Sequence, residues 1–562
     1  DGFNFLLALG DSFARNPSED AYYGDEEAKP LTENLSDLNE GGVIVYDEGV
    51  LAEAAEAVDL EARAAENDWH VYPVDLREMA REQGREVMRN TAGVGVTAAL
   101  LDIDTGYFEE LISEVMGGEI EQANLEILAT AYERASEFDR THDLRVPTGE
   151  HDAEMAMLSG SNAIAYAALD AGCRFISGYP MTPWTDVFTI MSQNLPRYGG
   201  ISEQVEDEIA AASLAIGASH AGVKAMSGSS GGGFSLMSEP LGMAEMTETP
   251  VVLIEAMRAG PSTGMPTKTE QADLEHVLYT SQGDSSRVVF APGSVREAYE
   301  QTRAAFEIAY EYHLPAIVLY DQKLGGELRT VPTAFFDREP DPSLGATLSE
   351  EELAEVAHDA SGKFRRYRHD PEDGVSPRSI PGQAGGRFLA TGNEHQQVGH
   401  ISEDPDNRRA QVDRRLRKFD AIREALTDRG HQAYRGPEGA TYGLLAWGSQ
   451  QDTVFEAVDR LREAGHDVRA LGVSDLVPYP RAEVEAFLED VEEAVVVEMN
   501  ATAQFRGLTQ RELGRFGPKL SSMLKYDGEP FEPGEIVESF RATVEETEPT
   551  EPARNVRLAR GD

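Results

Sequence analysis

The chain is poor in cysteine, in basic residues and in long apolar runs. Its 562 residues include one cysteine, Cys173, so no disulfide can form within the chain. Iron-sulfur clusters are held by several cysteine thiolates, and any such cluster must therefore belong to a partner chain. We expect Cys173 to be a small buried side chain, which is the usual role of a free cysteine.

The apolar runs are too short to span a membrane. No stretch approaches the roughly twenty apolar residues that cross a bilayer, and the beginning of the sequence shows no signal-peptide pattern. The sequence therefore predicts a cytoplasmic protein with no membrane contact. Hydrophobic residues make up 41% of the chain, as in other globular proteins, and the length predicts about three or four domains.

Basic residues are outnumbered by acidic ones. The sequence has 49 Lys and Arg residues against 101 Asp and Glu, for a formal net charge of −52. The acids are spread through every segment. Such a surface repels itself in dilute salt and is screened in molar salt, where the Debye length is about 3 Å. This pattern indicates a halophilic cytoplasm and argues against nucleic-acid binding.

Three predicted strands between residues 175 and 264 each end in a turn rich in small residues. The first strand runs into Gly178–Pro183, the second into Gly228–Gly233 and the third into Arg258–Gly264. Ligands of open parallel sheets bind in the crevice beyond the carboxyl ends of the strands. The sequence therefore predicts a binding site where these three turns converge.

Glu208 begins a predicted helix that has no charged face. Residues 209–218 contain no charged side chain, and the positions that follow Glu208 at helical spacing are alanine or isoleucine. A carboxylate without a partner is costly on such an apolar stripe. A buried glutamate can hydrogen-bond to a ring nitrogen of a heteroaromatic cofactor, so Glu208 is a candidate cofactor ligand.

Each of these features also has a purely structural interpretation. Pro180 and Pro183 fit a plain loop, Glu208 fits an acid that complements a helix dipole, and Arg258 fits an internal ion pair. The three features in this order favour a functional site over three separate structural explanations.

The same segments resemble the pyrimidine-binding domain of the alpha subunit of 2-oxoacid:ferredoxin oxidoreductases. The resemblance rests on Gly178-Tyr-Pro-Met-Thr-Pro183, on Glu206-Asp-Glu-Ile-Ala-Ala211 and on the run from Arg258 to Gln271. It implies thiamine diphosphate as cofactor. The aminopyrimidine of this cofactor must reach its imino tautomer, and a carboxylate at the ring nitrogen drives that change.

The resemblance also implies roles for individual residues. Glu208 would be the carboxylate on the aminopyrimidine, and Arg258 would receive the substrate carboxylate, for which its planar fork is suited. Thr182 would contact cofactor or substrate, and Trp184 would crowd the substrate end. The remaining candidates are Tyr179 and Pro180 at the cofactor, and Ser262 and Thr263 at the substrate.

The chain contains no Gly-Asp-Gly sequence, the motif with which thiamine enzymes hold the magnesium diphosphate. The resemblance therefore implies a separate beta subunit that supplies the diphosphate site, Mg²⁺ and at least one [4Fe-4S] cluster. With coenzyme A as substrate, the assembly would convert a 2-oxoacid to an acyl-CoA and reduce ferredoxin. We expect a heterotetramer of alpha and beta subunits, (alpha-beta)2, and an inactive isolated chain.

Three points stay open at this stage. Pyruvate is slightly favoured over 2-oxoglutarate, although a second cation near Arg258 would favour the dicarboxylate, and Lys268 is a candidate for it. A nonredox thiamine-dependent decarboxylase or transketolase-like heteromer is the alternative function. A noncatalytic paralogue that retains the fold ranks third.

Strand and helix patterns alternate along most of the chain and predict an α/β protein with doubly wound parallel sheets. Residues 1–150 resemble the gamma domain fused to many alpha subunits, apparently without its N-terminal part. Residues 438–545 resemble a transketolase C-terminal domain. The other predicted segments are the pyrimidine-binding domain (151–330), an irregular interface segment (331–437) and a disordered acidic tail (546–562).

Overall fold

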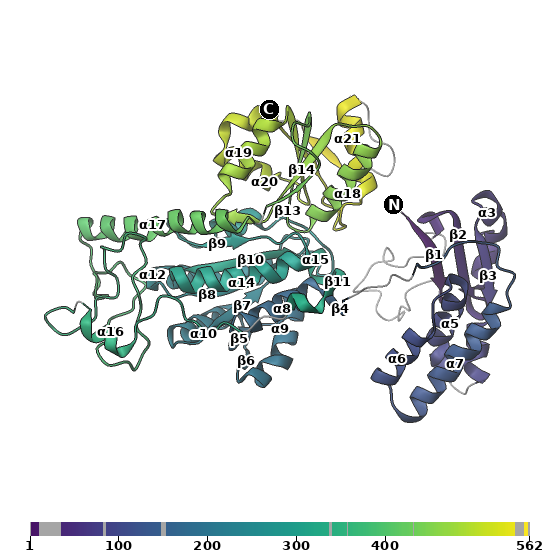
Figure 1. Cartoon of the computed structure of the whole chain (residues 1–562), viewed down its shortest axis with the longest axis horizontal. Coiled ribbons are helices and arrows are strands. Elements are labelled where there is room, and N and C mark those ends of the chain that lie inside the picture. Colours follow the sequence, from purple (N-terminus) through teal and green to yellow (C-terminus); the bar gives the residue numbers. More distant parts are fainter. Residues whose placement is uncertain are drawn as a thin grey trace. The chain divides into compact units, whose positions relative to one another are not determined.

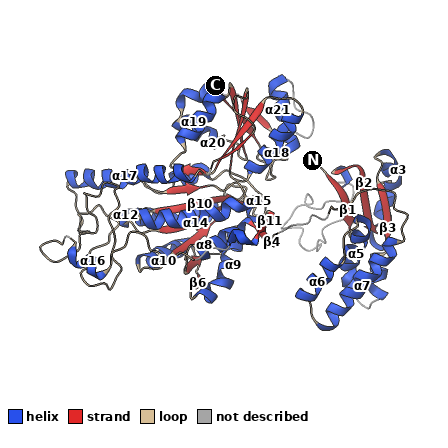
Figure 2. Cartoon of the chain, viewed as in Figure 1, coloured by secondary structure: helices blue, strands red, loops and turns tan. Residues whose placement is uncertain are grey.

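The computed structural model describes residues 2–9, 35–82, 86–147, 153–336, 340–356, 358–430, 432–545 and 556–559. These fall into two compact units, residues 1–152 and residues 153–562, whose helices and strands are drawn in Figures 1 and 2. Both units combine helices with parallel strands, so the predicted α/β fold class is confirmed. Within the described residues, no helix is both long and apolar enough to cross a membrane.

The first unit is built on a parallel three-stranded sheet in the order β1-β2-β3. Its strands are β1 (Phe3–Ala8), β2 (Leu38–Asp47) and β3 (His70–Val74). Helices α5 (Arg89–Leu101) and α7 (Gly118–Ser136) pack in one apolar cluster with β2 and β3. Helices α2 (Glu48–Ala57) and α3 (Leu60–Glu66) pack in a second cluster. Its remaining helices are α4 (Leu76–Glu82) and α6 (Gly106–Val115).

The larger unit contains a seven-stranded sheet in the order β15-β9-β10-β8-β7-β5-β6. All of its pairings are parallel except that of β15 with β9. The strands are β5 (Phe175–Gly178), β6 (Ile201–Gln204), β7 (Ala225–Ser229), β8 (Val251–Met257), β9 (Val288–Phe290), β10 (Pro315–Asp321) and β15 (Asp475–Val477). Every residue of β8 is buried, as expected for a strand covered on both faces.

Helices cover both faces of this sheet. One face packs against α8 (Gly160–Asp170), α9 (Trp184–Asn194) and α14 (Val295–Tyr312). The other packs against α10 (Glu208–His220), α12 (Ser238–Thr247) and α13 (Leu274–Tyr279). Ser159 begins α8 with a capping box, as its hydroxyl and position predict. The thiol of Cys173 is fully buried in the first face, which confirms its predicted role.

The strand order reverses beside β5. The chain runs from β5 to β6 on one side of it and then returns to β7 on the other side. Open α/β sheets bind ligands at such a switch point, beyond the carboxyl ends of the strands. The turns after β5, β7 and β8 therefore lie at the edge where the sequence predicts a site.

A second sheet in the same unit has the order β12-β14-β13-β16-β17-β18. Its strands are β12 (Ala433–Arg435), β13 (Tyr442–Trp447), β14 (Val468–Val473), β16 (Glu493–Glu498), β17 (Leu520–Leu524) and β18 (Arg557–Ala559). It packs with α18 (Gln450–Glu463), α19 (Arg481–Asp490), α20 (Gln504–Glu512) and α21 (Pro533–Glu545). Trp447 and Leu471 share one apolar cluster with Leu253 of the seven-stranded sheet, so the two sheets have a common core.

The prediction of an irregular segment over 331–437 is wrong for its last third. Residues Pro405–Arg429 form α17, a helix of 25 residues that runs along the larger unit (Figure 1). Its buried positions include Gln411, Arg414 and Lys418 as well as apolar residues. Because polar side chains occupy much of its buried face, the helix lacks the apolar periodicity by which a sequence pattern is found. A short helix, α16 (Glu350–Glu355), precedes it.

The prediction of a disordered tail is also wrong in part. Residues Arg557–Ala559 form β18 and pair antiparallel with β17. Val556 is buried and Leu558 packs on the same apolar cluster, so these residues carry enough apolar surface to dock. The rest of the predicted tail, 546–555 and 560–562, lies outside the described residues.

Candidate active site

Glu208 lies at the start of α10 with its side chain 3% exposed. Its neighbour Asp207 caps the helix by accepting a hydrogen bond from the amide of Ala210 at 2.8 Å. The carboxylate of Glu208 instead accepts a hydrogen bond at Oε1 from the hydroxyl of Ser229, at 3.0 Å. Asp207 therefore caps the helix, while the carboxylate of Glu208 lies in a buried contact with Ser229.

The glycine-rich turn after β7, in which Gly231–Phe234 form the single-turn helix α11, lies against three parts of this site. A Cβ atom on Gly233 would overlap with Oε1 of Glu208 and with the Ser229 hydroxyl. A Cβ atom on Gly231 would stand 2.6 Å from Oδ2 of Asp273, and one on Gly232 would stand 3.7 Å from the Ser262 carbonyl oxygen. Because glycine has no side chain, the turn lets two acids approach its backbone from different elements.

Arg258 lies at the end of β8 with 9% of its surface exposed. Its Nη1 donates a hydrogen bond to the carbonyl oxygen of Thr182 at 2.7 Å, which joins the turn after β8 to the turn after β5. Burial lowers the pKa of Arg258, and the charge of Asp273 opposes that shift. Arginine stays charged in such an environment, so the side chain is a permanent cation at this edge.

The structure brings most of the predicted site residues to one edge of the sheet. Met181, beside Thr182, contacts the Ser229 hydroxyl through its sulfur at 3.6 Å, which links the turn after β5 to Glu208. Ser262 lies near the glycine-rich turn. The remaining candidates, Tyr179, Pro180 and Thr263, are exposed, and no hydrogen bond or ion pair joins them to Glu208 or Arg258 in the described part of the chain.

The expectation for Trp184 is wrong. Its ring is fully buried in the core of the sheet and packs against Phe188, with ring centroids 6.1 Å apart. A Cβ atom on Gly228 would stand 2.6 Å from this ring. Trp184 therefore fills space beneath the strand ends and does not line the exposed turn after β5.

Sequence reasoning missed two further acids at this edge, Glu255 and Asp273. Glu255 is fully buried within β8, where it lies directly beside Ser229 of β7 in the sheet register. Burial and the neighbouring carboxyl of Asp273, the residue before α13, hold the pKa of Glu255 well above its ordinary value. Glu255 could have been singled out from the sequence, because it is the one charged residue in the otherwise apolar strand Val251–Met257.

Gln271 connects the segment after Arg258 to the second sheet. Its side chain donates to the Trp447 carbonyl oxygen at 2.8 Å and accepts from the Met499 amide at 3.0 Å. Lys268, the candidate second cation, forms an exposed ion pair with Glu529. The arginine-bearing segment is therefore fixed at its far end by the second sheet.

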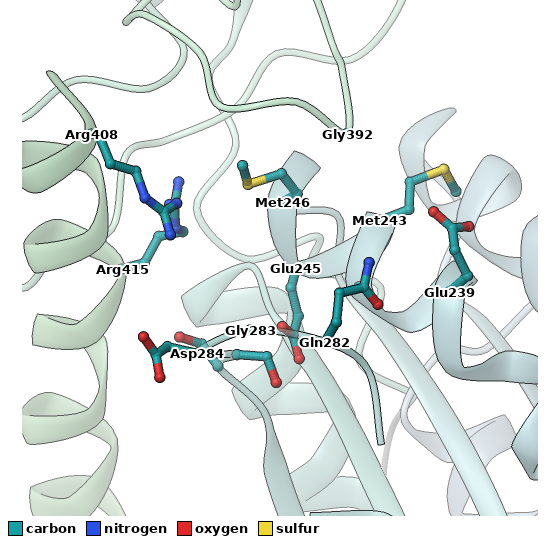
Figure 3. Close-up of a pocket in the computed structure, with 13 residues that line it drawn as sticks. Glu239, Met243, Glu245, Met246, Gln282, Gly283, Asp284, Gly392, Arg408 and Arg415 are labelled. Carbon is teal, nitrogen blue, oxygen red and sulfur yellow. The ribbon is translucent and has the colours of Figure 1, made fainter. Parts of the chain in front are cut away.

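A cavity of about 220 Å³ lies elsewhere in the unit (Figure 3). It is bordered by α12, by residues 282–286 before β9, and by Arg408 and Arg415 of α17. These elements meet at the amino ends of β8 and β9, opposite the strand ends that carry Glu208 and Arg258. Glu245 in this cavity has its pKa raised to about 7 by burial, which outweighs the nearby Arg287. The cavity is not part of the candidate active site.

Three family profiles match separate parts of this chain. A family profile described as "Pyruvate flavodoxin/ferredoxin oxidoreductase, thiamine diP-bdg" matches residues 166–414. Two further profiles match residues 3–134 and 440–526, described as "Pyruvate ferredoxin/flavodoxin oxidoreductase" and "Pyruvate:ferredoxin oxidoreductase core domain II". The 2-oxoglutarate synthase subunit KorA of Methanothermobacter thermautotrophicus is 34% identical over 387 residues, which cover 68% of this chain and 97% of that protein.

The chain belongs to the alpha-subunit family of 2-oxoacid:ferredoxin oxidoreductases. Another relative in this family is subunit alpha of 2-oxoacid:ferredoxin oxidoreductase 2 from Aeropyrum pernix. It is 29% identical over 570 residues, covering 92% of this chain and 87% of the relative. The resemblance seen in the three turns is thereby confirmed, and the chain is part of an oxidoreductase.

A solved structure of the family has the same fold. The 2-oxoglutarate:ferredoxin oxidoreductase of Magnetococcus marinus, with 2-oxoglutarate, coenzyme A and succinyl-CoA bound, aligns with a TM-score of 0.83 at 29% identity. The alignment covers 97% of this chain and 88% of that chain. Both described units of this chain therefore have a counterpart in an enzyme of the family.

The residues at the strand ends fit the thiamine cofactor named in the family description. Oε1 of Glu208 is held by Ser229, while Oε2 has no hydrogen-bond partner among the described residues. A buried carboxylate with one anchored and one available oxygen suits a ring nitrogen that must be hydrogen-bonded away from water. The Ser230 hydroxyl in the adjacent turn is also buried without a partner.

Proposed function

We propose that the chain acts in the oxidative decarboxylation of a 2-oxoacid to an acyl-CoA, with ferredoxin as electron acceptor. In this reaction the bond between the carboxylate and the carbonyl carbon breaks and CO2 leaves. The electron pair passes to ferredoxin, and the acyl group is transferred to the thiol of coenzyme A. The observation that carries the proposal is the buried Glu208, anchored to Ser229 at the edge of the sheet where Arg258 also lies.

Glu208 is proposed to bind the aminopyrimidine nitrogen through its available oxygen, with Ser229 fixing the carboxylate plane. Bound thiamine diphosphate would supply the carbanion stabilisation that decarboxylation of a 2-oxoacid needs. The apolar residues of α10 on the same face exclude water from the carboxylate, which strengthens its hydrogen bond to the cofactor. Tyr179, Pro180 and Thr182 are proposed to border the cofactor from the turn after β5.

Arg258 is proposed to bind the carboxylate of the 2-oxoacid. Its hydrogen bond to the Thr182 carbonyl oxygen uses one nitrogen and orients the planar guanidinium. The remaining N–H groups can form the bidentate contact that carboxylates favour. Ser262 and Thr263, which follow Arg258 in the same turn, are proposed to contact the substrate as well.

The other half of the active site is proposed to lie on a beta subunit, together with Mg²⁺ and a [4Fe-4S] cluster. The sequence has one cysteine and no Gly-Asp-Gly. Relatives of this chain are named alpha subunits or subunit KorA, which supports an assembly of several chains. We propose that this assembly is an (alpha-beta)2 heterotetramer that passes electrons to ferredoxin.

Two observations bear on the choice of 2-oxoacid. The KorA subunits of Methanothermobacter thermautotrophicus and Archaeoglobus fulgidus are named as parts of 2-oxoglutarate synthases, and the solved structure contains 2-oxoglutarate. Lys268, the candidate cation for a second carboxylate, is engaged by Glu529, which favours a monocarboxylate such as pyruvate. Because exposed ion pairs contribute little free energy, this pairing is weaker support than the relatives, and we propose 2-oxoglutarate first and pyruvate second.

The proposal is tested on the chain copurified with its partner subunit in about molar salt, where the acidic surface is screened. The assay follows viologen reduction with 2-oxoglutarate or pyruvate, with and without coenzyme A, and identifies the acyl-CoA by mass spectrometry. We expect CoA-dependent reduction with one of the two acids. Release of CO2 without dye reduction would instead support a nonredox thiamine enzyme and overturn the proposal.

A further inference from the structure

The buried Glu255 of β8 and the partly buried Asp273 before α13, termed here the acid pair, lie at the same edge of the sheet as Arg258. We propose that Glu255 holds a proton at neutral pH and donates it to a charged Asp273, so that the acid pair adds one negative charge beside Arg258 instead of two. The proposal assigns the acid pair a positioning role in the active site. Its meaning for substrate binding rests on the proposed function, whereas the protonation state itself does not.

The geometry leaves Glu255 without any external donor. Its side chain is fully buried, and neither carboxyl oxygen accepts a hydrogen bond from a donor group in the described part of the chain. The ionisable group that acts on it is the carboxyl of Asp273. Two carboxylates cannot form a hydrogen bond unless one of them carries a proton, and an ionised carboxylate at such a position is strongly disfavoured.

Asp273 is the better site for the negative charge. It precedes α13 without capping it, and its Oδ2 lies against the backbone of Gly231. Burial raises the pKa of Asp273, but His276 and Arg258 both favour its charged form, while no cation acts on Glu255. The proton therefore belongs on Glu255, the member that is fully enclosed in β8.

The other ionisable groups around the acid pair do not change this assignment. Glu270 lies in the segment that follows Arg258 and disfavours a second negative charge. Tyr320 on β10 packs in the apolar cluster on the opposite face of the sheet, and burial raises its pKa, so it is neutral. Glu208 is separated from Glu255 by the Ser229 hydroxyl, which it binds itself. Additional ionisation of Glu255 would place more negative charge around Arg258.

The consequence for the enzyme is a charge balance at the substrate cation. With one charge on the acid pair, the positive charge of Arg258 is matched by Asp273. A second charge on Glu255 would leave an excess of negative charge and would repel an anionic 2-oxoacid. The retained proton thus keeps the guanidinium available to the substrate carboxylate.

The first test compares Glu255→Gln with Asp273→Asn in the copurified complex by thermal unfolding at pH 7. A glutamine reproduces a protonated carboxyl and can donate to Asp273, so Glu255→Gln should unfold no earlier than the wild type. Asp273→Asn removes the charge that faces Arg258 and His276 and should unfold several degrees earlier. The reverse ranking, or equal losses in both variants, would place the proton on Asp273 or on neither residue and would overturn the proposal.

The second test uses the pH dependence of the same transition and requires no turnover. Because the folded state raises the pKa of Glu255, the wild type should lose stability as pH rises above about 4.5, and Glu255→Gln should lack this loss. The Tm of Glu255→Gln minus that of the wild type should grow by about 1 to 2 °C for each pH unit between pH 5 and 8. A difference independent of pH would contradict the retained proton.

The third test measures the KM for the 2-oxoacid and so links the acid pair to substrate binding. The KM of the wild type divided by that of Glu255→Gln should rise between pH 7 and pH 9, because only the wild type can ionise further at this position. A ratio that does not change with pH would overturn the positioning role. If the complex turned over no 2-oxoacid but gave the expected unfolding results, the proposed function would be wrong. The proton assigned to Glu255 would still be supported.

Discussion

Gly233 lies in such close contact with Glu208 that a single methyl group on the glycine would occupy the position of the carboxylate oxygen that Ser229 binds. The contact joins the turn after β7 to the start of α10, two elements of the same sheet face. It fixes where the carboxylate lies without any bond to the glycine itself. The site geometry therefore depends on the absence of a side chain at residue 233.

Replacement of Gly233 by alanine tests this contact. Gly233→Ala should displace the Glu208 carboxylate and lower 2-oxoacid turnover by about 100-fold, as expected when a catalytic group moves by about 1 Å. The measurement is CoA-dependent dye reduction together with retention of thiamine diphosphate after gel filtration. Gly232→Ala is the matched control, because its Cβ atom meets nothing closer than 3.7 Å. Equal activity in the two variants would contradict the role of the contact.

Arg258→Lys tests the substrate cation. Lysine keeps the positive charge but loses the planar fork and the oriented hydrogen bond to Thr182. We expect the KM for the 2-oxoacid to rise by about 10- to 100-fold, the range of one or two lost charge-assisted hydrogen bonds. The control is Arg296→Lys on α14, where the side chain is 68% exposed and should not affect KM. An unchanged KM in Arg258→Lys would remove the arginine from substrate binding.

Glu248→Gln tests how α17 is held. Glu248 is buried and pairs with Arg414 and with Lys418, the latter at 2.6 Å. Loss of its charge leaves two buried cations without a counter-ion, which should lower the free energy of unfolding by about 3 to 5 kcal/mol. Chemical unfolding in molar salt measures this loss. Asp420→Asn on the exposed face of α17, where Arg423 is its partner, should change it by less than about 0.5 kcal/mol.

The same cluster predicts a loss of stability in acid. Burial alone would raise the pKa of Glu248, but Arg414 and Lys418 together hold it well below the ordinary value. The charged form is thus favoured in the folded state, and its contribution is present above about pH 4.5 and is lost as pH falls further. Glu248→Gln should therefore unfold with a weaker dependence on pH below 4.5 than the wild type. Parallel pH curves for the two proteins would contradict this linkage.

The net charge of −52 predicts a protein that requires salt. Dilution from about 2 M to 0.1 M KCl lengthens the Debye length from a few ångströms to about 10 Å and restores repulsion between the dispersed acids. We expect the Tm to fall by many degrees over this range. Sucrose, added as a neutral control at low salt, should not restore it to the value in molar salt. A Tm independent of salt would contradict the halophilic interpretation.

Much of the α/β architecture could be predicted from the sequence because its strands are compact apolar runs between polar helices. Val251–Met257 is one such run, and its burial on both faces follows from its composition. Helix α17 could not be predicted in this way. Its buried face carries Gln411, Arg414 and Lys418, which pair with groups that lie far away in the sequence. Only the folded chain shows that these charges are satisfied.

The sequence predicted the motifs of the candidate site but not all of the contacts between them. Glu208 and Arg258 stood out because a charge in an apolar helix and an arginine after an apolar strand need an explanation. The placement of Trp184 was wrong, because an aromatic residue beside a motif can equally face the core. Ser229 and Asp273 were missed because their importance depends on contacts across strands, which the spacing of residues along the chain does not reveal.

The most direct measurement of the central claim is 2-oxoacid turnover by the copurified complex in molar salt for the wild type and for Glu208→Ala. The account predicts CoA-dependent reduction of ferredoxin or viologen by the wild type. In the variant, activity should be lost while the two subunits still copurify, because Glu208 acts on the cofactor and its removal leaves the rest of the fold in place. Equal activity in the variant would contradict the assignment of the active site to this edge of the sheet.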